Sequence, residues 1–231
     1  MNHHHTPDNF HPNKQGKALH VGLIPDGGRR WARKNNVSLS KSYAVSRDLG
    51  ISIAKYLFSL GVSELSVYLS SSQNFSRSDS EIASFTSAAA KSLENEILDL
   101  ARLLNLRVVI VGNNKSISSK VVDLLMRHNK QLDSRYVRRL NLCISYNPTE
   151  ELENAISLSK SSGIFLEYLW VTKPVDLIIR SGGANLISNF LPLQSGFARL
   201  YFLDELFNDV PLSSIKNIMN SFLELNRKFG D

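Results

Sequence analysis

The sequence of 231 residues has little cysteine and no long apolar run. Its one cysteine, Cys143, excludes an intrachain disulfide framework and favours a cytoplasmic protein. Cys143 lies in an apolar, strand-like stretch, which predicts a buried core thiol and not a nucleophile. No apolar run approaches the ~20 residues of a membrane-spanning helix, so we expect no integral membrane segment.

The beginning of the chain lacks the apolar core of a signal peptide. Residues 1–18 are polar, and we interpret them as a disordered tail or a remnant of cloning. Residues 19–231 are predicted to form one domain. The tail contains His3, His4 and His5, but three histidines in a flexible segment are a weak indication of a metal site.

Acidic residues are fewer than basic ones, 21 against 27, which gives a net charge of +6. A positive excess indicates an anionic partner: nucleic acid, a phosphorylated small molecule or an acidic membrane face. Nucleic-acid binding usually needs a basic stripe with interleaved aromatic residues, whereas the dense run here is confined to residues 135–139. That run is interpreted as a solvated turn before a strand, so we expect no nucleic-acid partner.

Apolar, strand-like segments recur along the chain and alternate with helical patterns. Most are near-continuous apolar runs, which are typical of strands buried on both faces of a parallel sheet. The strand-like segments are residues 20–25, 64–70, 105–112, 139–147, 174–180 and 198–203, and the helical patterns cover residues 43–61, 79–105, 116–132 and 213–230. The alternation predicts an α/β fold: a single domain with a mainly parallel β-sheet of about six strands flanked by helices.

Polar segments follow the ends of three of these strands. They are PDGGRRW (25–31), SSSQNFSR (70–77) and RSGGANLISN (180–189). In an open parallel sheet the ligand crevice lies outside the carboxyl ends of the strands, so we expect these segments to meet there.

The first segment combines groups that bind phosphate with one acidic residue. Backbone amides of Gly27 and Gly28 can face an anion, and Arg29 and Arg30 can fork onto phosphate oxygens. A lone carboxylate opposes anion binding unless it holds Mg²⁺, which predicts that Asp26 is a metal ligand. The alternative is a strand–turn–helix in which Asp26 caps the helix. The segment is neither a P-loop nor the dinucleotide fingerprint.

The other two segments offer further polar groups. Asn74 and Arg77 lie in the second segment, where a polar loop leading into a helix is the simpler interpretation. The third repeats the theme of the first, because Arg180 ends a strand, two glycines follow, and Ser188 adds a hydroxyl group. The third segment is thus a second candidate diphosphate cradle, and two anion-binding segments at one sheet edge are stronger evidence than either alone. A phosphate-ester-binding α/β module such as a nucleotide-binding regulator is an alternative.

These segments together resemble a known family. HVGLIPDGGRRWA is similar to the cis-prenyltransferase signature His-x-x-x-Ile-Met-Asp-Gly-Asn-Gly-Arg-Trp-Ala, and SSSQNFSR to Ser-Ser-Glu-Asn-Trp-x-Arg. PVDLIIRSGGANLISNFLPLQSGFARLYF is similar to Asp-Leu-x-Ile-Arg-Thr-Gly-Gly-x-x-Arg-Ile-Ser-Asn-Phe-Leu-Leu-Trp-Gln-x-x-x-x-Glu-Leu-Tyr-Phe. The match runs in order from about residue 20 to 229, so the sequence is identified as a member of the family that includes undecaprenyl diphosphate synthase.

The resemblance implies an enzyme that joins isoprenoid diphosphates with the help of Mg²⁺ and acts as a homodimer, with residues 19–231 as its catalytic domain. Asp26 is implied to hold the Mg²⁺–diphosphate, and Asn74 to lie near the reacting centre and assist proton loss. Arg30 and Tyr43 complete the implied catalytic residues. Diphosphate binding is implied for Gly27, Gly28, Arg29, Arg30, Arg77, Arg180 and Ser188, and the wall of the product tunnel for Leu69, Phe75 and Trp31.

Departures from the family pattern cluster at the implied site. Tyr43 stands where the family has His, and Leu186 replaces an Arg of the second diphosphate site. Arg199 replaces a Glu that in the family reaches across the dimer to the metal. Gly28, Arg29 and Leu39 are further departures, at positions of Asn, Gly and Arg.

Three functions remain open after these departures. The motifs are closest to the cyclolavandulyl diphosphate synthase branch, which implies head-to-middle coupling of two dimethylallyl diphosphates; geranyl and isopentenyl diphosphate are other candidate substrates. Leu69 narrows the tunnel towards a short product, or is plain core packing. Regular cis elongation with isopentenyl diphosphate is the second function. The third is a cyclase or a catalytically silent subunit, in which Arg199 pairs with Asp26.

Overall fold

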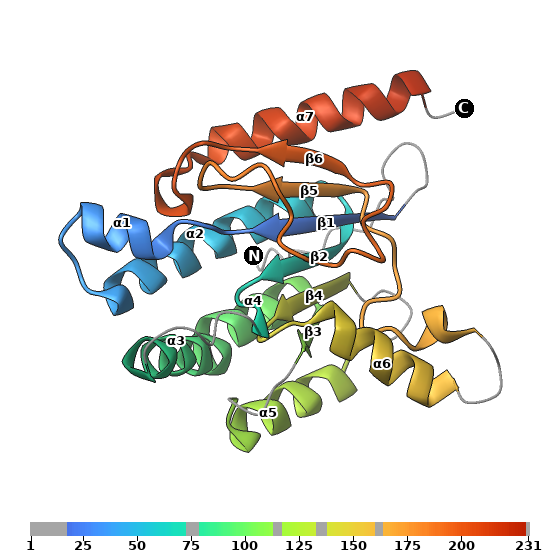
Figure 1. Cartoon of the computed structure of the whole chain (residues 1–231), viewed down its shortest axis with the longest axis horizontal. Helices are drawn as coiled ribbons and strands as arrows, with labels where there is room; N and C mark the ends of the chain where they lie inside the picture. The colour runs from blue at the N-terminus through green and yellow to red at the C-terminus, as the bar shows by residue number, and fades with distance from the viewer. Residues whose placement is uncertain (1–17, 73–78, 113–116, 133–137, 160–163, 230–231) are drawn as a thin grey trace, which may run out of the picture.

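The computed structural model describes residues 18–72, 79–112, 117–132, 138–159 and 164–229. Their centre is one six-stranded sheet with the order β3-β4-β2-β1-β5-β6 (Figure 1), in which every neighbouring pair is parallel. This confirms the α/β class and the parallel sheet. Asn74, Phe75, Arg77 and the histidines of the tail lie outside the described residues.

All six predicted strands form, each within a few residues of its predicted bounds. They are β1 (Leu19–Ile24), β2 (Val62–Tyr68), β3 (Leu106–Val111), β4 (Arg138–Cys143), β5 (Leu177–Arg180) and β6 (Arg199–Phe202). Cys143 is fully buried at the end of β4, and burial raises the pKa of its thiol, as expected for a core residue.

The helical elements comprise the four predicted helices, with changed bounds, and others outside the four predicted ranges. They are α1 (Gly28–Lys34), α2 (Leu39–Ser59), α3 (Asp79–Ser92), a π-helical turn η2 (Leu93–Ile97), α4 (Leu98–Leu104), α5 (Ser119–Lys130), α6 (Pro148–Ser159), the 3₁₀ turns η4 (Phe165–Tyr168) and η5 (Phe207–Asp209), and α7 (Leu212–Phe229). Helix α2 begins four residues early because the Ser38 hydroxyl accepts the Lys41 amide and caps it. Within the described ranges no helix is both long and apolar enough to cross a membrane.

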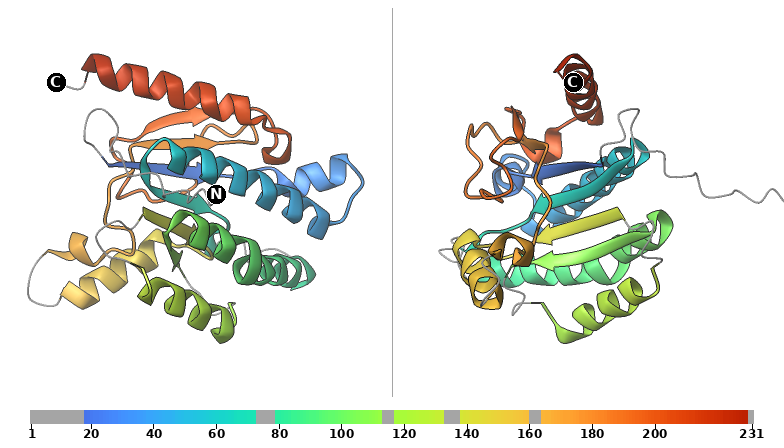
Figure 2. Two further views of the ribbon diagram at one scale, coloured as in Figure 1. Left: turned by 180° about the vertical axis from the view of Figure 1, so that it is seen from behind. Right: turned by 90° about the vertical axis from the view of Figure 1, so that its right-hand side faces the viewer.

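The two faces of the sheet differ in chemistry. Successive strand residues point to opposite faces, so Leu23, Leu65 and Leu142 lie on one apolar face. Helices α2 and α4 cover that face, whereas α6 and the segment 181–198 lie on the other side (Figure 2). The opposite face carries polar residues on β2 and β4, which corrects the expectation of strands that are apolar on both sides.

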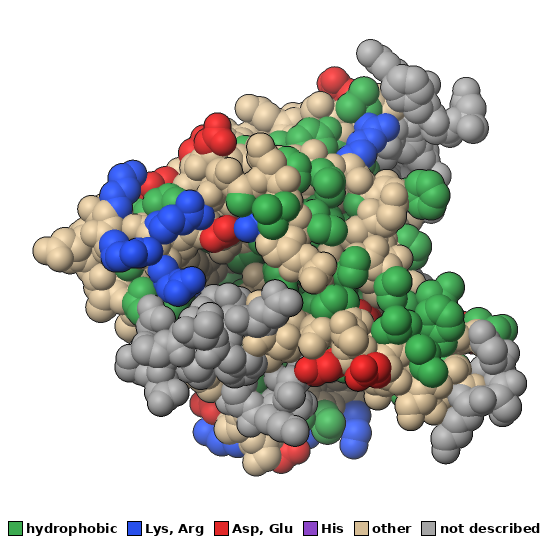
Figure 3. Space-filling view, viewed as in Figure 1, with side chains coloured by type: hydrophobic (Ala, Val, Ile, Leu, Met, Phe, Trp, Pro, Cys, Tyr) green, Lys and Arg blue, Asp and Glu red, His purple; other side chains and the backbone are tan. Residues whose placement is uncertain are grey.

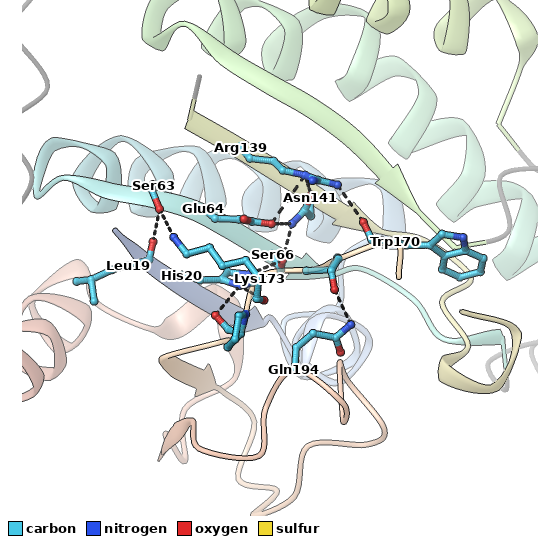
Figure 4. Close-up of polar contacts among 12 residues, drawn as sticks. Leu19, His20, Ser63, Glu64, Ser66, Arg139, Asn141, Trp170, Lys173 and Gln194 are labelled. Atoms are coloured by element: carbon cyan, nitrogen blue, oxygen red, sulfur yellow. Dashed lines mark hydrogen bonds and ion pairs between the residues drawn. The ribbon is translucent and has the colours of Figure 1, made fainter. Parts of the chain in front are cut away.

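Those polar residues form one hydrogen-bonded chain across the sheet (Figure 4). His20 Nδ1 faces the Lys173 carbonyl at 3.0 Å, so this nitrogen carries the proton and donates it. His20 Nε2 is then the acceptor for the Ser66 hydroxyl at 2.8 Å, and that hydroxyl accepts from Asn141 Nδ2 at 2.9 Å. Asn141 also donates to Glu64 at 2.6 Å. This series of hydrogen bonds requires a neutral His20 imidazole with its proton on Nδ1.

Acidification is therefore expected to destabilise the fold through His20. Burial lowers the pKa of His20 from its ordinary 6.5, and the nearby Glu64 opposes this only in part. Below that ordinary value the unfolded chain binds more protons than the folded one, so the free energy of unfolding falls as the pH falls through 6.5. Urea unfolding between pH 8 and 5 measures the slope. His20→Gln should flatten it, and an unchanged slope would contradict the assignment.

Candidate active site

A cleft of about 920 Å³ opens at the carboxyl ends of β1, β2 and β5. As predicted, it brings together the first and third polar segments and the beginning of the second. The predicted site residues that line it are Asp26, Gly27, Gly28, Arg29, Arg30, Tyr43, Leu69, Arg180 and Ser188. Basic side chains gather beside a hollow at the end of the molecule where α1 lies (Figure 3). One such residue, Arg33, was missed, although it follows Arg29 and Arg30 at helical spacing.

Among the described residues that line the cleft, Asp26 is the acidic one. Its Oδ2 accepts from Arg180 Nη2 at 2.9 Å, and its Oδ1 lies 3.4 Å from Arg30 Nη2. The Asp26 carbonyl accepts from the Ser181 hydroxyl and the Phe207 amide, each at 2.9 Å. The backbone is thus held between two loops, while 35% of the side chain stays exposed to the cleft.

Two glycines allow the loops to close around Asp26. Gly27 has φ 113°, and a Cβ there would come within 3.0 Å of Leu206 Cα. Gly182 has φ 89°, and its Cβ would lie 2.6 Å from Arg30 Nη2. Gly27 is also the N-cap of α1, and no side chain caps that helix, so Asp26 does not act as the cap. The carboxylate therefore remains available to a ligand.

Arg180 joins the first segment to the third. Its side chain is 8% exposed, and besides Asp26 it donates to the Leu186 carbonyl at 2.6 Å and to Ser188 Oγ at 2.8 Å. Ser188 has a left-handed backbone with φ 51°, which turns its hydroxyl towards Arg180. Arg180 and Ser188 therefore form one preorganised unit beside Asp26.

Tyr68 is a second cleft residue that the sequence analysis missed. Its hydroxyl donates to the Ser188 carbonyl at 3.2 Å, and its ring stacks on Phe190 with centroids 4.9 Å apart. Burial raises the pKa of Tyr68, so the phenol remains a neutral donor. Its position as the last residue of β2 was the available signal.

An apolar chamber of about 150 Å³ lies behind the cleft, between the apolar face of the sheet and the helices α2, α3 and α4. Cleft and chamber share the lining residues Pro25, Tyr43, Ser46, Leu69 and Phe85, so these residues mark the junction. Tyr43 packs edge-on against Phe85 with ring centroids 5.9 Å apart. A polar cleft that leads into an apolar chamber suits a ligand with a charged head and a hydrocarbon tail.

Trp31 and Arg199 lie elsewhere. Trp31 follows Arg30 by one helical position and so points away from the cleft, where its indole N–H donates to Asp209 at 2.6 Å. Arg199 is the first residue of β6, at the end of the sheet opposite Asp26, and its guanidinium lies over the Phe222 ring. The structure thus does not bring Trp31 to the tunnel wall. It also keeps Arg199 away from Asp26 of the same chain, so a pairing of the two residues across a dimer stays a prediction.

The donor set restricts how a metal can bind. Among the residues that the structure describes, no group of three or more His, Cys, Asp or Glu side chains converges. Asp26 alone fits Mg²⁺ only if substrate phosphates and waters complete the coordination, which is the usual way in which proteins hold this ion. The residues are therefore compatible with a magnesium ion that arrives together with a diphosphate.

Comparisons with known proteins agree with this arrangement. The family model for undecaprenyl diphosphate synthase matches residues 24–230. An isoprenyl transferase of Treponema denticola is 26% identical over 221 residues, which cover 92% of this chain and 97% of that protein. The ditrans,polycis-undecaprenyl-diphosphate synthase ((2E,6E)-farnesyl-diphosphate specific) of Blochmanniella floridana is 27% identical over 230 residues, or 91% of this chain and 90% of that one.

A solved structure shares the fold. It is lavandulyl diphosphate synthase from Lavandula x intermedia in complex with dimethylallyl diphosphate, with a TM-score of 0.78 and 22% sequence identity. The alignment covers 88% of this chain and 94% of that chain. The similarity extends over the sheet and the flanking helices and is not limited to one motif.

Proposed function

The chain belongs to the cis-prenyltransferase family, and we propose that it couples two short isoprenoid diphosphates head-to-middle, with dimethylallyl diphosphate as donor and acceptor. Its relatives are transferases of prenyl groups, and it is an enzyme of the same type acting on isoprenoid diphosphates. The proposal concerns which diphosphates react and how they are joined.

The sizes of the two cavities carry the proposal. The cleft of about 920 Å³ has room for two diphosphate groups, but the apolar chamber measures only about 150 Å³. An apolar cavity of about 150 Å³ holds one benzene molecule, which has one carbon more than an isoprene unit. A chamber of this size favours short tails and a short product, and it opposes stepwise growth to a long chain.

The donor site is formed by the first polar segment. Asp26 would hold Mg²⁺ on the donor diphosphate, and this ion supplies Lewis-acid stabilisation of the leaving group. Arg30 and the glycine amides at the start of α1 bind the same group, because guanidinium and amide donors match phosphate oxygens. Tyr43 and Leu69 hold the tail at the junction, away from water.

The acceptor site is formed by the third segment. Ser188 and Arg180 face the cleft, but Arg180 already donates to Asp26, Leu186 and Ser188. The side chain of Leu186 is 54% exposed and adds no charge. The acceptor half of the cleft therefore offers few cations to a second diphosphate. We expect the acceptor to be held weakly there, with its double bond directed towards the donor.

The coupling step balances without a further reactant. The C1–O bond of the donor breaks, and its electron pair leaves with the diphosphate. Carbon C1 then bonds to C2, the interior double-bond carbon of the acceptor, and the resulting cation loses a proton to the released diphosphate or to solvent. The cleft contributes fixed charge and alignment, which are large terms in such reactions. Asn74, the implied proton-transfer residue, lies outside the described residues.

Dimethylallyl diphosphate as the sole substrate is expected to yield a branched or cyclic ten-carbon diphosphate. The protein is incubated with dimethylallyl, geranyl or farnesyl diphosphate, each with and without isopentenyl diphosphate. Mass spectrometry then identifies the dephosphorylated products. Products that require isopentenyl diphosphate and grow in five-carbon steps would show regular elongation instead. No product from any mixture, despite binding, would indicate a silent subunit.

The expected homodimer and the cytoplasmic location stay predictions. The edge strand β6 supports the dimer, because Leu200 is 45% exposed there and the preceding Phe197 is fully exposed. A second copy of the chain would cover these apolar side chains.

A further inference from the structure

Arg47 is a charged residue in the wall of the apolar chamber. It lies on α2, one turn beyond Tyr43, and only 23% of its side chain is exposed. Its Nη1 lies 2.7 Å from Glu96 Oε1, and its Nη2 lies 2.8 Å from Asp48 Oδ1. The two carboxylates pair with the guanidinium, and we infer that the aliphatic part of the side chain faces the chamber, as long cationic side chains commonly arrange themselves.

The π-helical turn explains why Glu96 lies beside Arg47 and not in the lining of the chamber. Ala89 lines the chamber, and Glu96 follows it by seven residues, a spacing that keeps the same face in a regular α-helix. The wider turn at Leu93–Ile97 rotates the chain, so that Ile97 lines the chamber instead. Glu96 is thereby displaced sideways towards α2, where it meets Arg47. Such interruptions are frequent at functional sites.

Stability does not account for the ion pair. Glu96 Oε2 is buried and has no hydrogen-bond partner among the described residues. Half-buried ion pairs contribute little to the free energy of folding, and an unpaired buried oxygen opposes it. What the pair does geometrically is to bridge the two helical elements that flank the chamber.

We propose that the Arg47–Glu96 pair closes the chamber between α2 and the π-helical turn and thereby sets the longest prenyl chain that the enzyme accepts. The proposal rests on the proposed function, since it requires a prenyl tail in the chamber. On this proposal, a tail longer than about ten carbons would have to displace the Arg47 side chain. Arg47 is thus a residue that determines chain-length specificity and takes no part in the chemistry.

Gly50 provides a variant with the opposite effect. It lies on α2, one turn beyond Arg47, and also lines the chamber. A Cβ at this position meets no atom within 4 Å, so a larger side chain can enter the chamber without a clash. A longer side chain at position 50 should reduce the space in the chamber. Loss of the Arg47 side chain should have the opposite effect and enlarge it.

Binding of unreactive S-thiolodiphosphates tests the pair without relying on turnover. Calorimetric titration with the dimethylallyl, geranyl and farnesyl analogues in Mg²⁺ compares wild type with Arg47→Ala, Gly50→Leu and a control. The control is Arg102→Ala, which breaks the exposed surface pair with Asp99. Each buried CH₂ adds about 0.8 kcal/mol, so a fully buried isoprene unit of five carbons would tighten binding by about 10³-fold, and a gain of about tenfold marks a unit that is buried only in part.

We expect wild type and Arg102→Ala to gain nothing from geranyl to farnesyl, whereas Arg47→Ala gains about tenfold. Gly50→Leu should keep the dimethylallyl analogue and lose geranyl binding. If Arg47→Ala keeps the wild-type length profile, the inference is overturned and the proposed function stands. If wild type binds no prenyl analogue, the proposed function fails, and the inference with it. Should Arg47→Ala not fold, Glu96→Gln, which removes the charge that pairs Arg47 with the π-helical turn, decides by the same criterion.

Discussion

Asp26→Asn is expected to lower turnover of isoprenoid diphosphates by about 10³-fold or more while the fold remains. The Asp26 carboxylate lines the cleft and contacts the guanidinium groups of Arg30 and Arg180. The amide can still accept the Arg180 hydrogen bond through its oxygen, so the loops should stay closed. It cannot hold Mg²⁺ against the leaving diphosphate, because a neutral oxygen is a much weaker ligand for this ion.

The matched control for Asp26→Asn is Asp99→Asn. Asp99 is a carboxylate paired with Arg102 on the surface, with 74% of its side chain exposed. Its loss should leave both turnover and stability nearly unchanged, within about 0.5 kcal/mol. Steady-state kinetics across a range of Mg²⁺ concentrations, together with circular dichroism, gives the comparison. A near-wild-type rate for Asp26→Asn at saturating Mg²⁺ would show that the metal and the leaving group are held elsewhere.

Arg180→Met is expected to reduce kcat/KM by about 10²-fold or more and to destabilise the fold by about 2 kcal/mol. The buried guanidinium holds Asp26, the Leu186 carbonyl and Ser188 Oγ at once. A thioether of similar length fills the space but leaves those acceptors without a donor. The loss of stability is kept moderate because Asp26 is partly exposed and retains Arg30.

Urea unfolding and kinetics with each substrate varied in turn measure both effects of Arg180→Met. Arg180→Lys keeps the charge but not the planar fork, and should recover only part of the activity. Arg102→Met, at an exposed ion pair, controls for the loss of a guanidinium as such. Unchanged stability together with unchanged KM for both substrates would mean that the clamp between the two segments is dispensable.

Local sequence patterns were sufficient to predict most of the strands and helices of the fold. Near-continuous apolar segments predicted all six strands, because a strand buried in a parallel sheet needs apolar residues along its length. The pattern failed where a sheet face is polar yet buried: Ser66 and Asn141 are satisfied by each other across neighbouring strands. Helix α6 was missed because its exposed face carries Ile156 and Leu158, which obscure the helical pattern.

The candidate site was predictable as far as strand ends determine it. Asp26 follows β1, Arg180 is the last residue of β5 and Ser188 follows β5, and parallel strands bring such ends to one edge. The direction of individual side chains was not predictable in the same way. Trp31 is adjacent to Arg30 in sequence, yet its indole contacts Asp209, which is distant along the chain. Arg199 lies at the wrong end of its strand to reach Asp26 in the same chain.

By itself, the order of apolar and polar residues determined the parallel sheet, the sheet edge that carries the candidate site and the charge of that edge, because these follow from hydrogen bonding and burial along the chain. Only the tertiary structure decided the size of the chamber and which groups close it. The Arg47–Glu96 contact joins a helix to a π-helical turn far along the chain. The rotation of that turn depends on packing against the rest of the molecule, which no local pattern records.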